Sequence, residues 1–199
     1  MAAASEVRID DPAGLVTLSA LLERELGLLG ASARPVAFAC IGTDRSTGDA
    51  LGPLVGQRLL KLGYDPAGVI GTLEEPLHAL NLEERLLPLV EARGPRPLIV
   101  AVDAALGAMA NVGAVNVRRG GLLPGQGVGK SLPRIGELAV TATVNVQAGA
   151  LDVQVLQSTR LFLVQQLAEL IGVSCWWAHR NLRRAAAGTA AGAPRVVAA

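Results

Sequence analysis

Two aspartates in one short loop are the first residues of this sequence that could do chemistry. The segment 39–53 reads ACIGTDRSTGDALGP, which places Asp44 and Asp49 among glycines and hydroxyl side chains. An apolar run precedes the loop and an amphipathic stretch follows it, a pattern that predicts a strand, a polar turn and a helix. The loop could therefore hold a catalytic carboxylate or a phosphate, or it could only start the helix.

A third aspartate, Asp103, follows the apolar run LIVAV (98–102), at the expected carboxyl end of a central strand. Parallel α/β sheets bind ligands at that edge, where the strand order reverses. If the strands before Asp49 and Asp103 are neighbours, their carboxyls face each other, and such a pair can activate water and protonate a leaving group. The alternatives are a loop cap for Asp103 and a helix N-cap for Asp49, where the helix dipole would lower the carboxyl pKa.

Two further segments carry weaker signals. His78 follows the second expected strand, so it could join the two aspartates in a metal site, or it could be a surface or capping residue. The stretch PGQGVGKS (124–131) does not match a phosphate-binding P-loop, because Pro124 stands where the first glycine is required. The backbone amides of its glycines, Gly127 among them, could still line a site.

Composition limits the classes of protein to which this chain could belong. Its 199 residues, about half of them apolar, suit one domain with a substantial core. The formal net charge of +1 gives no electrostatic reason to expect nucleic acid or an anionic membrane as a partner. Two cysteines are too few for a disulfide framework or a zinc site. We see neither a signal peptide nor an apolar run of ~20 residues, and we expect a cytoplasmic protein.

Apolar runs that alternate with amphipathic stretches predict a parallel sheet with helices on both faces. Strands are expected at 36–41, 69–73, 98–104, 112–117 and 137–144, and helices at 15–29, 51–62, 77–93 and 150–171. The expected organisation is an N-terminal helix and lead-in (1–34), an α/β core (35–177) and a disordered Ala- and Arg-rich tail (178–199).

Five motifs in unbroken order resemble those of the YyaC-type sporulation proteins, which are relatives of the spore germination protease. They are IGTDRSTGDALGPLVG, GTLEEPLHALNLEE, IVAVDAALG, PGQGVGKSLPRIGEL and VLQSTRLFLV. The resemblance covers about residues 35–171. It implies a three-layer α/β/α sandwich of the phosphorylase/hydrolase type, with a mostly parallel, mixed central sheet, which the hydrogenase-maturation endopeptidases share.

The resemblance also implies roles for individual residues. The germination protease is regarded as a metal-independent acid protease with two catalytic aspartates, and the matching positions are Asp49 and Asp103. We expect Asp49 to activate water and Asp103 to donate a proton, without metal or cofactor. The residues expected to shape or border the site are Gly42, Thr43, Asp44, His78 and Asn81, with Thr43 or a loop amide near the developing oxyanion.

A metal site like that of the maturation endopeptidases is not expected. Those enzymes use a histidine as their third ligand, and the corresponding segment here, TVNV (143–146), contains none. The site would form only if His78 took that place.

The function implied is that of a sporulation-associated peptidase in the cytoplasm of the spore-forming cell or forespore. Its partner would be a protein or peptide substrate, including spore proteins, and a homo-oligomer is left open. One alternative is a non-catalytic binding or scaffold protein on the same fold, because the substrate-handling insertions of the germination protease are not evident. Another is a small-molecule hydrolase or phosphorylase that uses the glycine-rich loop 120–131 for an anion.

Overall fold

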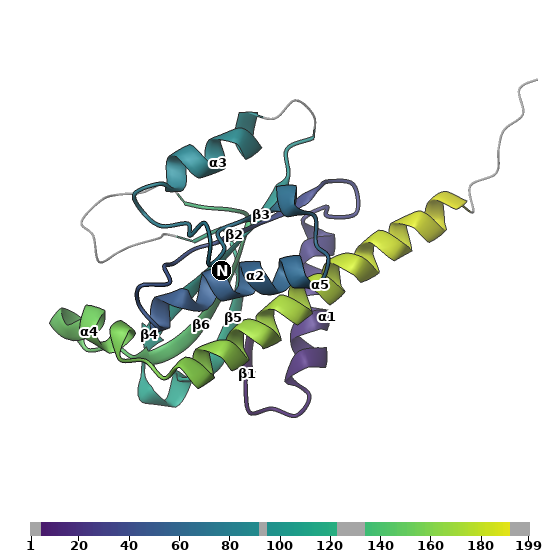
Figure 1. Ribbon diagram of the computed structural model, residues 1–199. Coiled ribbons are helices and arrows are strands. Elements are labelled where there is room, and N and C mark those ends of the chain that lie inside the picture. The colour runs from purple at the N-terminus through teal and green to yellow at the C-terminus, as the bar shows by residue number, and fades with distance from the viewer. Residues whose placement is uncertain (1–4, 92–94, 123–133, 192–199) are drawn as a thin grey trace, which may run out of the picture.

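The computed structural model describes residues 5–91, 95–122 and 134–191 of the chain (Figure 1). The strands are β1 (Ser5–Arg8), β2 (Val36–Cys40), β3 (Val69–Ile70), β4 (Leu98–Gly107), β5 (Ala114–Arg119) and β6 (Leu138–Val146). The α-helices are α1 (Gly14–Leu28), α2 (Leu51–Lys61), α3 (Leu82–Glu91), α4 (Asp152–Gln157) and α5 (Leu161–Ala191). Short 3-10 turns are η1 (Gly48–Ala50), η2 (Pro66–Gly68), η3 (Met109–Asn111) and η4 (Gly149–Leu151).

The strands within the described residues form one mixed sheet in the order β1-β5-β6-β4-β2-β3. Neighbours from β3 through β2 and β4 to β6 are parallel, whereas β5 and β1 add antiparallel pairs at one side. From β2 the chain passes to β3 on one side and then crosses to β4 on the other. The strand order therefore reverses between β2 and β4, as expected, and that position is where open α/β sheets bind ligands.

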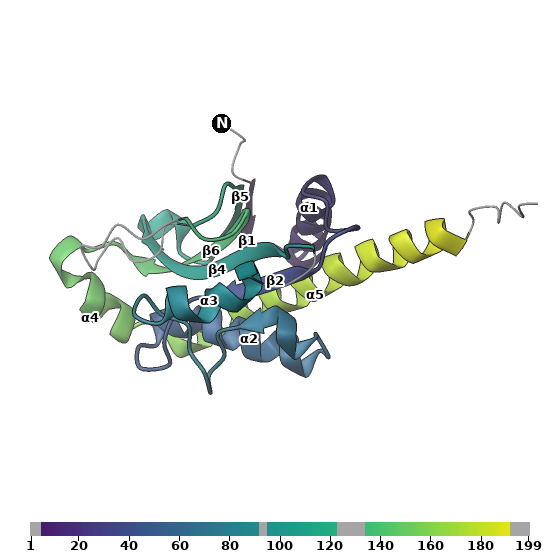
Figure 2. The ribbon, with the colours of Figure 1, turned by 90° about the horizontal axis from the view of Figure 1, so that it is seen from above.

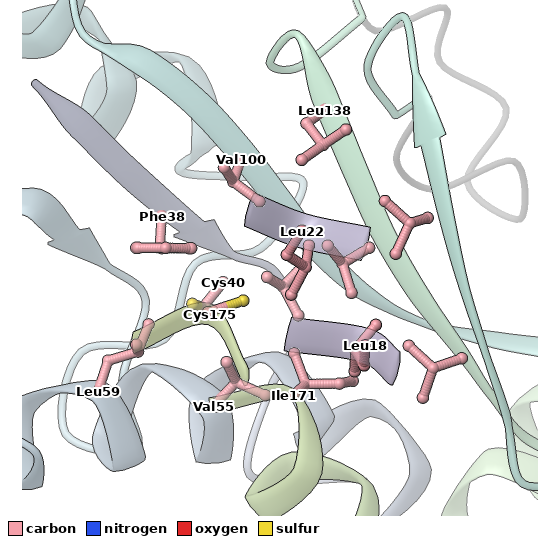
Figure 3. Packing of buried hydrophobic residues seen from close by; sticks show 14 of the residues in the cluster. Leu18, Leu22, Phe38, Cys40, Val55, Leu59, Val100, Leu138, Ile171 and Cys175 are labelled. Carbon is pink, nitrogen blue, oxygen red and sulfur yellow. The ribbon is translucent and has the colours of Figure 1, made fainter. Parts of the chain in front are cut away.

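The side chains of β2 point alternately into two apolar clusters, one on each face of the sheet. Val36, Phe38 and Cys40 belong to the larger cluster, which they share with side chains of α1, α2 and α5 (Figure 3). Ala37 and Ala39 face the smaller cluster, which includes side chains of α3 and of the loop before it. Figure 2 shows α2 and α5 lying along one face of the sheet. The three-layer α/β/α architecture is confirmed, since helices bury apolar surface on both faces of the sheet.

Several elements differ from expectation, three of them in their presence, start or continuity. Strand β1 was not expected, although its buried Val7 belongs to the core. Helix α3 begins at Leu82 because the residues before it form a turn. The helix expected at 150–171 is interrupted between α4 and α5, and α5 continues to Ala191.

The expectation of a disordered tail from residue 178 is wrong for the part of the tail that the structure describes. Ala178 is fully buried and Leu182 packs against the core, so helix α5 is held by tertiary contacts beyond the expected boundary. Alanine and arginine, which dominate this segment, are also among the strongest helix formers. Residues 192–199 lie outside the described part of the chain.

Helix α5 is long and apolar enough to cross a membrane when judged by length and composition alone. No such stretch was expected from the sequence. Its apolar character has an explanation in the fold, because Val164, Leu167 and Ile171 are fully buried against the sheet and the neighbouring helices. A core helix that packs on several neighbours needs this composition whether or not a membrane is present.

Candidate active site at the carboxyl edge of the sheet

Gly42 shapes the loop that carries Asp49. The Gly42 amide donates to the carbonyl of Leu77 (2.8 Å), and the Thr43 amide donates to the carbonyl of Asp49 (3.1 Å). Gly42 has a φ of 141°, and a Cβ built there would lie 1.9 Å from the Asp49 carbonyl oxygen. Only glycine allows this approach, because any side chain would clash with the backbone. The loop therefore folds back on itself and holds Asp49 beside the end of β2.

Asp49 is part of the 3-10 turn η1 rather than the N-cap of helix α2. The residue at the N-cap position is Ala50, and no side-chain hydrogen bond caps the helix there. The interpretation of Asp49 as a helix cap is therefore wrong in its details, although Asp49 does lie just before the helix. The carboxyl is not used as a cap for α2 and can serve another purpose.

Asp103 lies where the pairing of β2 with β4 stops. The sequence pattern predicts Asp103 at the end of its own strand, but β4 continues to Gly107 alongside β6. The last pair between β2 and β4 joins Cys40 to Val102, so Asp103 is the first residue of β4 beyond β2. Its Oδ1 atom accepts a hydrogen bond from the amide of Ala104 (2.8 Å). Asp103 is therefore at the carboxyl edge with respect to β2, which is the strand that leads to Asp49.

The two carboxyls interact electrostatically. Burial raises the pKa of Asp103 well above its ordinary value, the negative charge of Asp49 raises it further, and the Ala104 amide opposes the shift. Burial also raises the pKa of Asp49, against the opposing effects of a backbone hydrogen bond from Thr43 and the charge of His78. The expectation of a lowered Asp49 pKa is wrong, because desolvation of the carboxyl outweighs the influences that favour its charged form.

His78 is close enough to Asp49 for its charge to affect that carboxyl. It follows Leu77, which pairs with Ile41 in a parallel bridge just beyond β2. The Nδ1 atom of His78 is buried and has no hydrogen-bond partner among the described residues. Buried polar groups are normally hydrogen-bonded, so this nitrogen can still bond to a group that binds beside Asp49.

Asn81 has a structural task in the same loop. Its Oδ1 atom accepts from the amide of His78 (2.9 Å), and its Nδ2 atom donates to the carbonyl of Pro76 (3.0 Å). Both ends of the amide are therefore committed to the turn that precedes α3. The structure uses Asn81 to hold His78 in place, so its role in the site is indirect.

The remaining expected site residues are less closely associated with the carboxyl pair. Asp44 is exposed to solvent, and the hydroxyl of Thr43 accepts from the amide of Arg45 (3.3 Å). Gly127, together with the PGQGVGKS segment, lies outside the described residues.

Strand β6 supplies polar neighbours that the sequence analysis missed. Thr141 pairs with Asp103 in the parallel register, and Thr143 pairs with Ala105. Residues paired in adjacent strands point to the same face of the sheet, so Thr141 borders the Asp103 carboxyl. The signal was present in the sequence, because TATVN (141–145) has a polar residue at every second position.

Asn145 and Thr159 connect this edge to helix α4. The Nδ2 atom of Asn145 donates to the carbonyl of Val155 (3.3 Å) and to the Thr159 hydroxyl (3.2 Å). Thr159 is buried, and a Cβ at Gly48 would lie 2.9 Å from its hydroxyl oxygen. The segment from α4 to α5 therefore packs directly behind the turn that carries Asp49.

Within the described residues, no group of three or more His, Cys, Asp or Glu side chains is arranged so that it could hold a metal ion. This arrangement therefore does not support the alternative, raised from the sequence, that His78 completes a metal site with the two aspartates. What these residues offer is a pair of interacting carboxyls, with an imidazole beside one of them.

Comparison with known proteins agrees with this architecture. The chain resembles the crystal structure of a [NiFe] hydrogenase maturation protease, HycI, from Thermococcus kodakarensis KOD1, with a TM-score of 0.51 and 19% identity. The match covers 81% of this chain and 99% of that one, and at this identity it shows a shared fold. In sequence, the chain is 43% identical over 141 residues to the uncharacterized protein YyaC of Bacillus subtilis (strain 168).

The YyaC match covers 71% of this chain and 68% of that protein. The expected resemblance to YyaC-type proteins, and through the fold to the maturation endopeptidases, is thereby confirmed. The family model described as "Protein of unknown function (DUF1256)" matches residues 6–174. The chain therefore belongs to the DUF1256 family.

Proposed function

We propose that this protein is a peptidase in which Asp49 and Asp103 act together on a water molecule and a peptide bond. The observation that carries the proposal is the electrostatic interaction of two carboxyls from separate elements at the switch point of the sheet. Groups whose environments separate their protonation states are typical of acid and base pairs in enzymes. The fold shared with a maturation protease supports a peptidase over other hydrolases.

In the proposed reaction, Asp49 is ionised and Asp103 is protonated. The Asp49 carboxylate accepts a proton from water while the water oxygen forms a bond to the carbonyl carbon of the substrate. The Asp103 proton passes to the amide nitrogen of the substrate, and the C–N bond then breaks to leave an acid and an amine. The proton taken up by Asp49 then returns to Asp103, which restores the pair. The stronger pKa increase, which belongs to Asp103, supports this division of roles. A carboxyl with the higher pKa is the better proton donor.

This division of roles requires a bell-shaped dependence of kcat/KM on pH. Activity rises as the pH passes the pKa of Asp49 and falls as it passes the higher pKa of Asp103. Both pKa values are raised, so the active range lies above the ordinary aspartate value of about 3.9.

The proposed substrates are proteins or peptides of the spore-forming cell, spore proteins included, and the proposed place of action is the cytoplasm of that cell or its forespore. The relation to YyaC supports this setting. Mass spectrometry of spore extracts from a parent strain and an Asp49→Asn/Asp103→Asn strain tests it. We expect proteins that are shortened in the parent and intact in the variant, and identical extracts would contradict the proposal.

The decisive assay compares three single variants on a panel of peptides and spore-protein extracts. Asp49→Asn and Asp103→Asn should each lose about 10²-fold or more in kcat/KM, the usual contribution of a general acid or base. Asp44→Asn is the matched control, because Asp44 is an exposed aspartate of the same loop and should keep the parent's activity. If both folded Asn variants retained cleavage, the carboxyl pair would not be the catalytic one. A parent that cleaves nothing across the panel would favour a binding or scaffold protein instead.

A further inference from the structure

A cavity lies at the opposite edge of the sheet from the two aspartates. It is bordered by the residues that precede β2, β3 and β4 and by one side of helix α5, and its volume is about 770 Å³. Cavities of this size are typical of small-molecule sites. The side chains that matter for its chemistry are Arg34, Tyr64, Asp65, Trp176, Arg180 and Arg183.

Of the charged side chains that line this cavity, two cationic ones remain available to bind an anion. Arg34 is committed, because it donates to the carbonyl of Pro97 (3.1 Å) and to the carboxylate of Glu137 (2.7 Å). Among the described residues that line the cavity, the only carboxylate is that of Asp65, which accepts from the amide of Ala67 at the start of η2.

Arg180 and Arg183 stand one helical turn apart on α5, and both line the cavity. Neither forms an ion pair with a carboxylate in the part of the chain that the structure describes. Two guanidinium groups at this spacing can both reach one anionic group, since residues three apart on a helix lie on the same side.

Aromatic rings supply the apolar wall of the cavity. The Arg180 guanidinium lies over the ring of Trp176, 4.8 Å from its centroid, which holds that cation at the wall. The Tyr64 ring contacts the ring of His179 (5.0 Å between centroids), and its hydroxyl donates to the carbonyl of Val36 (2.7 Å). The His179 pKa is lowered by burial and by the positive charge of Arg183, so Arg183 lies close enough to these rings for its charge to affect His179.

We propose that this cavity binds a small organic anion, with its apolar ring against the aromatic wall and its phosphate or carboxylate group on Arg180 and Arg183. A ligand that is mostly apolar matches the proline, glycine and aromatic residues of the lining. The planar guanidinium groups of the two arginines match the geometry of an oxyanion. The site uses the amino edge of the sheet, whereas Asp49 and Asp103 use the carboxyl edge. It therefore stands independently of the proposed peptidase activity.

The test uses phenylphosphonate as the probe and the full-length protein. The chain contains two tryptophans, and Trp176 lines the cavity whereas Trp177 does not, so the Trp177→Phe protein reports on the cavity alone. We expect phenylphosphonate to change the Trp176 emission in a saturable way and to give a matching calorimetric isotherm. Inorganic phosphate lacks the ring and benzyl alcohol lacks the charge, so each should bind at least about tenfold more weakly.

Substitutions identify the cations. Arg180→Gln/Arg183→Gln should weaken phenylphosphonate binding about tenfold or more, because two charge-assisted hydrogen bonds are lost. Arg118→Gln/Arg184→Gln removes the same charge from exposed arginines outside the cavity and should leave binding unchanged. The proposal is overturned if the cavity variant binds as tightly as the parent, if benzyl alcohol binds as tightly as phenylphosphonate, or if no saturable binding occurs at millimolar probe. Circular dichroism verifies that each variant is folded.

Discussion

Replacement of Gly42 by alanine tests the loop geometry on which the candidate active site depends. A Cβ at Gly42 would lie 1.9 Å from the carbonyl oxygen of Asp49, well inside van der Waals contact, and the residue has a φ of 141°. The loop must therefore open between Gly42 and Asp49 to admit even a methyl group. Because the Thr43 amide donates to the same carbonyl, that hydrogen bond should also be lost.

The expected loss in the free energy of unfolding is the sum of two separate costs. A non-glycine residue with positive φ costs about 1–2 kcal/mol, and forcing an extra methyl group into a closely packed region costs about 1–3 kcal/mol. Gly42→Ala should therefore reduce the free energy of unfolding by about 2–5 kcal/mol. Gly63→Ala is the matched control, since Gly63 also has positive φ (81°) but nothing lies within 4 Å of its Cβ position. Gly63→Ala should incur only the cost of the positive φ.

Urea unfolding followed by circular dichroism measures both variants against the parent. The difference between Gly42→Ala and Gly63→Ala combines the contact with Asp49 and the greater backbone strain of φ 141° compared with φ 81°. A Gly42→Ala protein no less stable than Gly63→Ala would refute the close approach of the loop to Asp49. The proposed peptidase activity should fall in Gly42→Ala and remain in Gly63→Ala.

Three further predictions rest on separate contacts. Asp103→Asn should stabilise the protein at neutral pH. Because the pKa of Asp103 is raised in the folded protein, the carboxyl stabilises the fold fully below its unfolded pKa and loses that contribution as the pH rises through the folded pKa. Urea unfolding at pH 4 and pH 8 should show the parent losing stability relative to this variant, and a constant difference would contradict the raised pKa. Tyr64→Phe leaves the buried Val36 carbonyl without its 2.7 Å donor and should cost about 1–3 kcal/mol, measured by thermal unfolding, whereas no loss would contradict that hydrogen bond. Burial would raise the pKa of Glu25, but hydrogen bonds from Arg119 and Arg24 lower it, so Glu25→Gln should cost up to about 1 kcal/mol at pH 7, because solvent screens the exposed arginine partners. That cost should shrink as the pH falls through the lowered Glu25 pKa, and a pH-independent cost would argue against the ion pair.

Much of the fold could be read from local patterns. The apolar runs that form β2 and β4 and the amphipathic stretch that forms α2 are visible in consecutive residues, because strand and helix periodicities are local properties. The order in which β3, β2 and β4 lie side by side also followed from the common arrangement of such units. These features placed Asp49 and Asp103 near the same edge of the sheet.

Other features depended on neighbours that are distant in sequence. The continuation of α5 past Ala178 rests on its packing against the core, which an Ala- and Arg-rich sequence does not reveal. Thr141 became a neighbour of Asp103 only through the register between β4 and β6. His179, assigned to a disordered tail, lies half-buried against Tyr64 for the same reason.

The sequence by itself determined which residue types stand at the carboxyl edge, because alternating apolar and amphipathic segments specify a parallel sheet and its loops. Only the tertiary structure decided how those residues behave. The pKa of Asp49 depends on the water that the surrounding chain excludes, and that of Asp103 depends also on the charge of Asp49. Desolvation and charge interactions act through space, between residues more than fifty positions apart in the chain, and local sequence does not contain them.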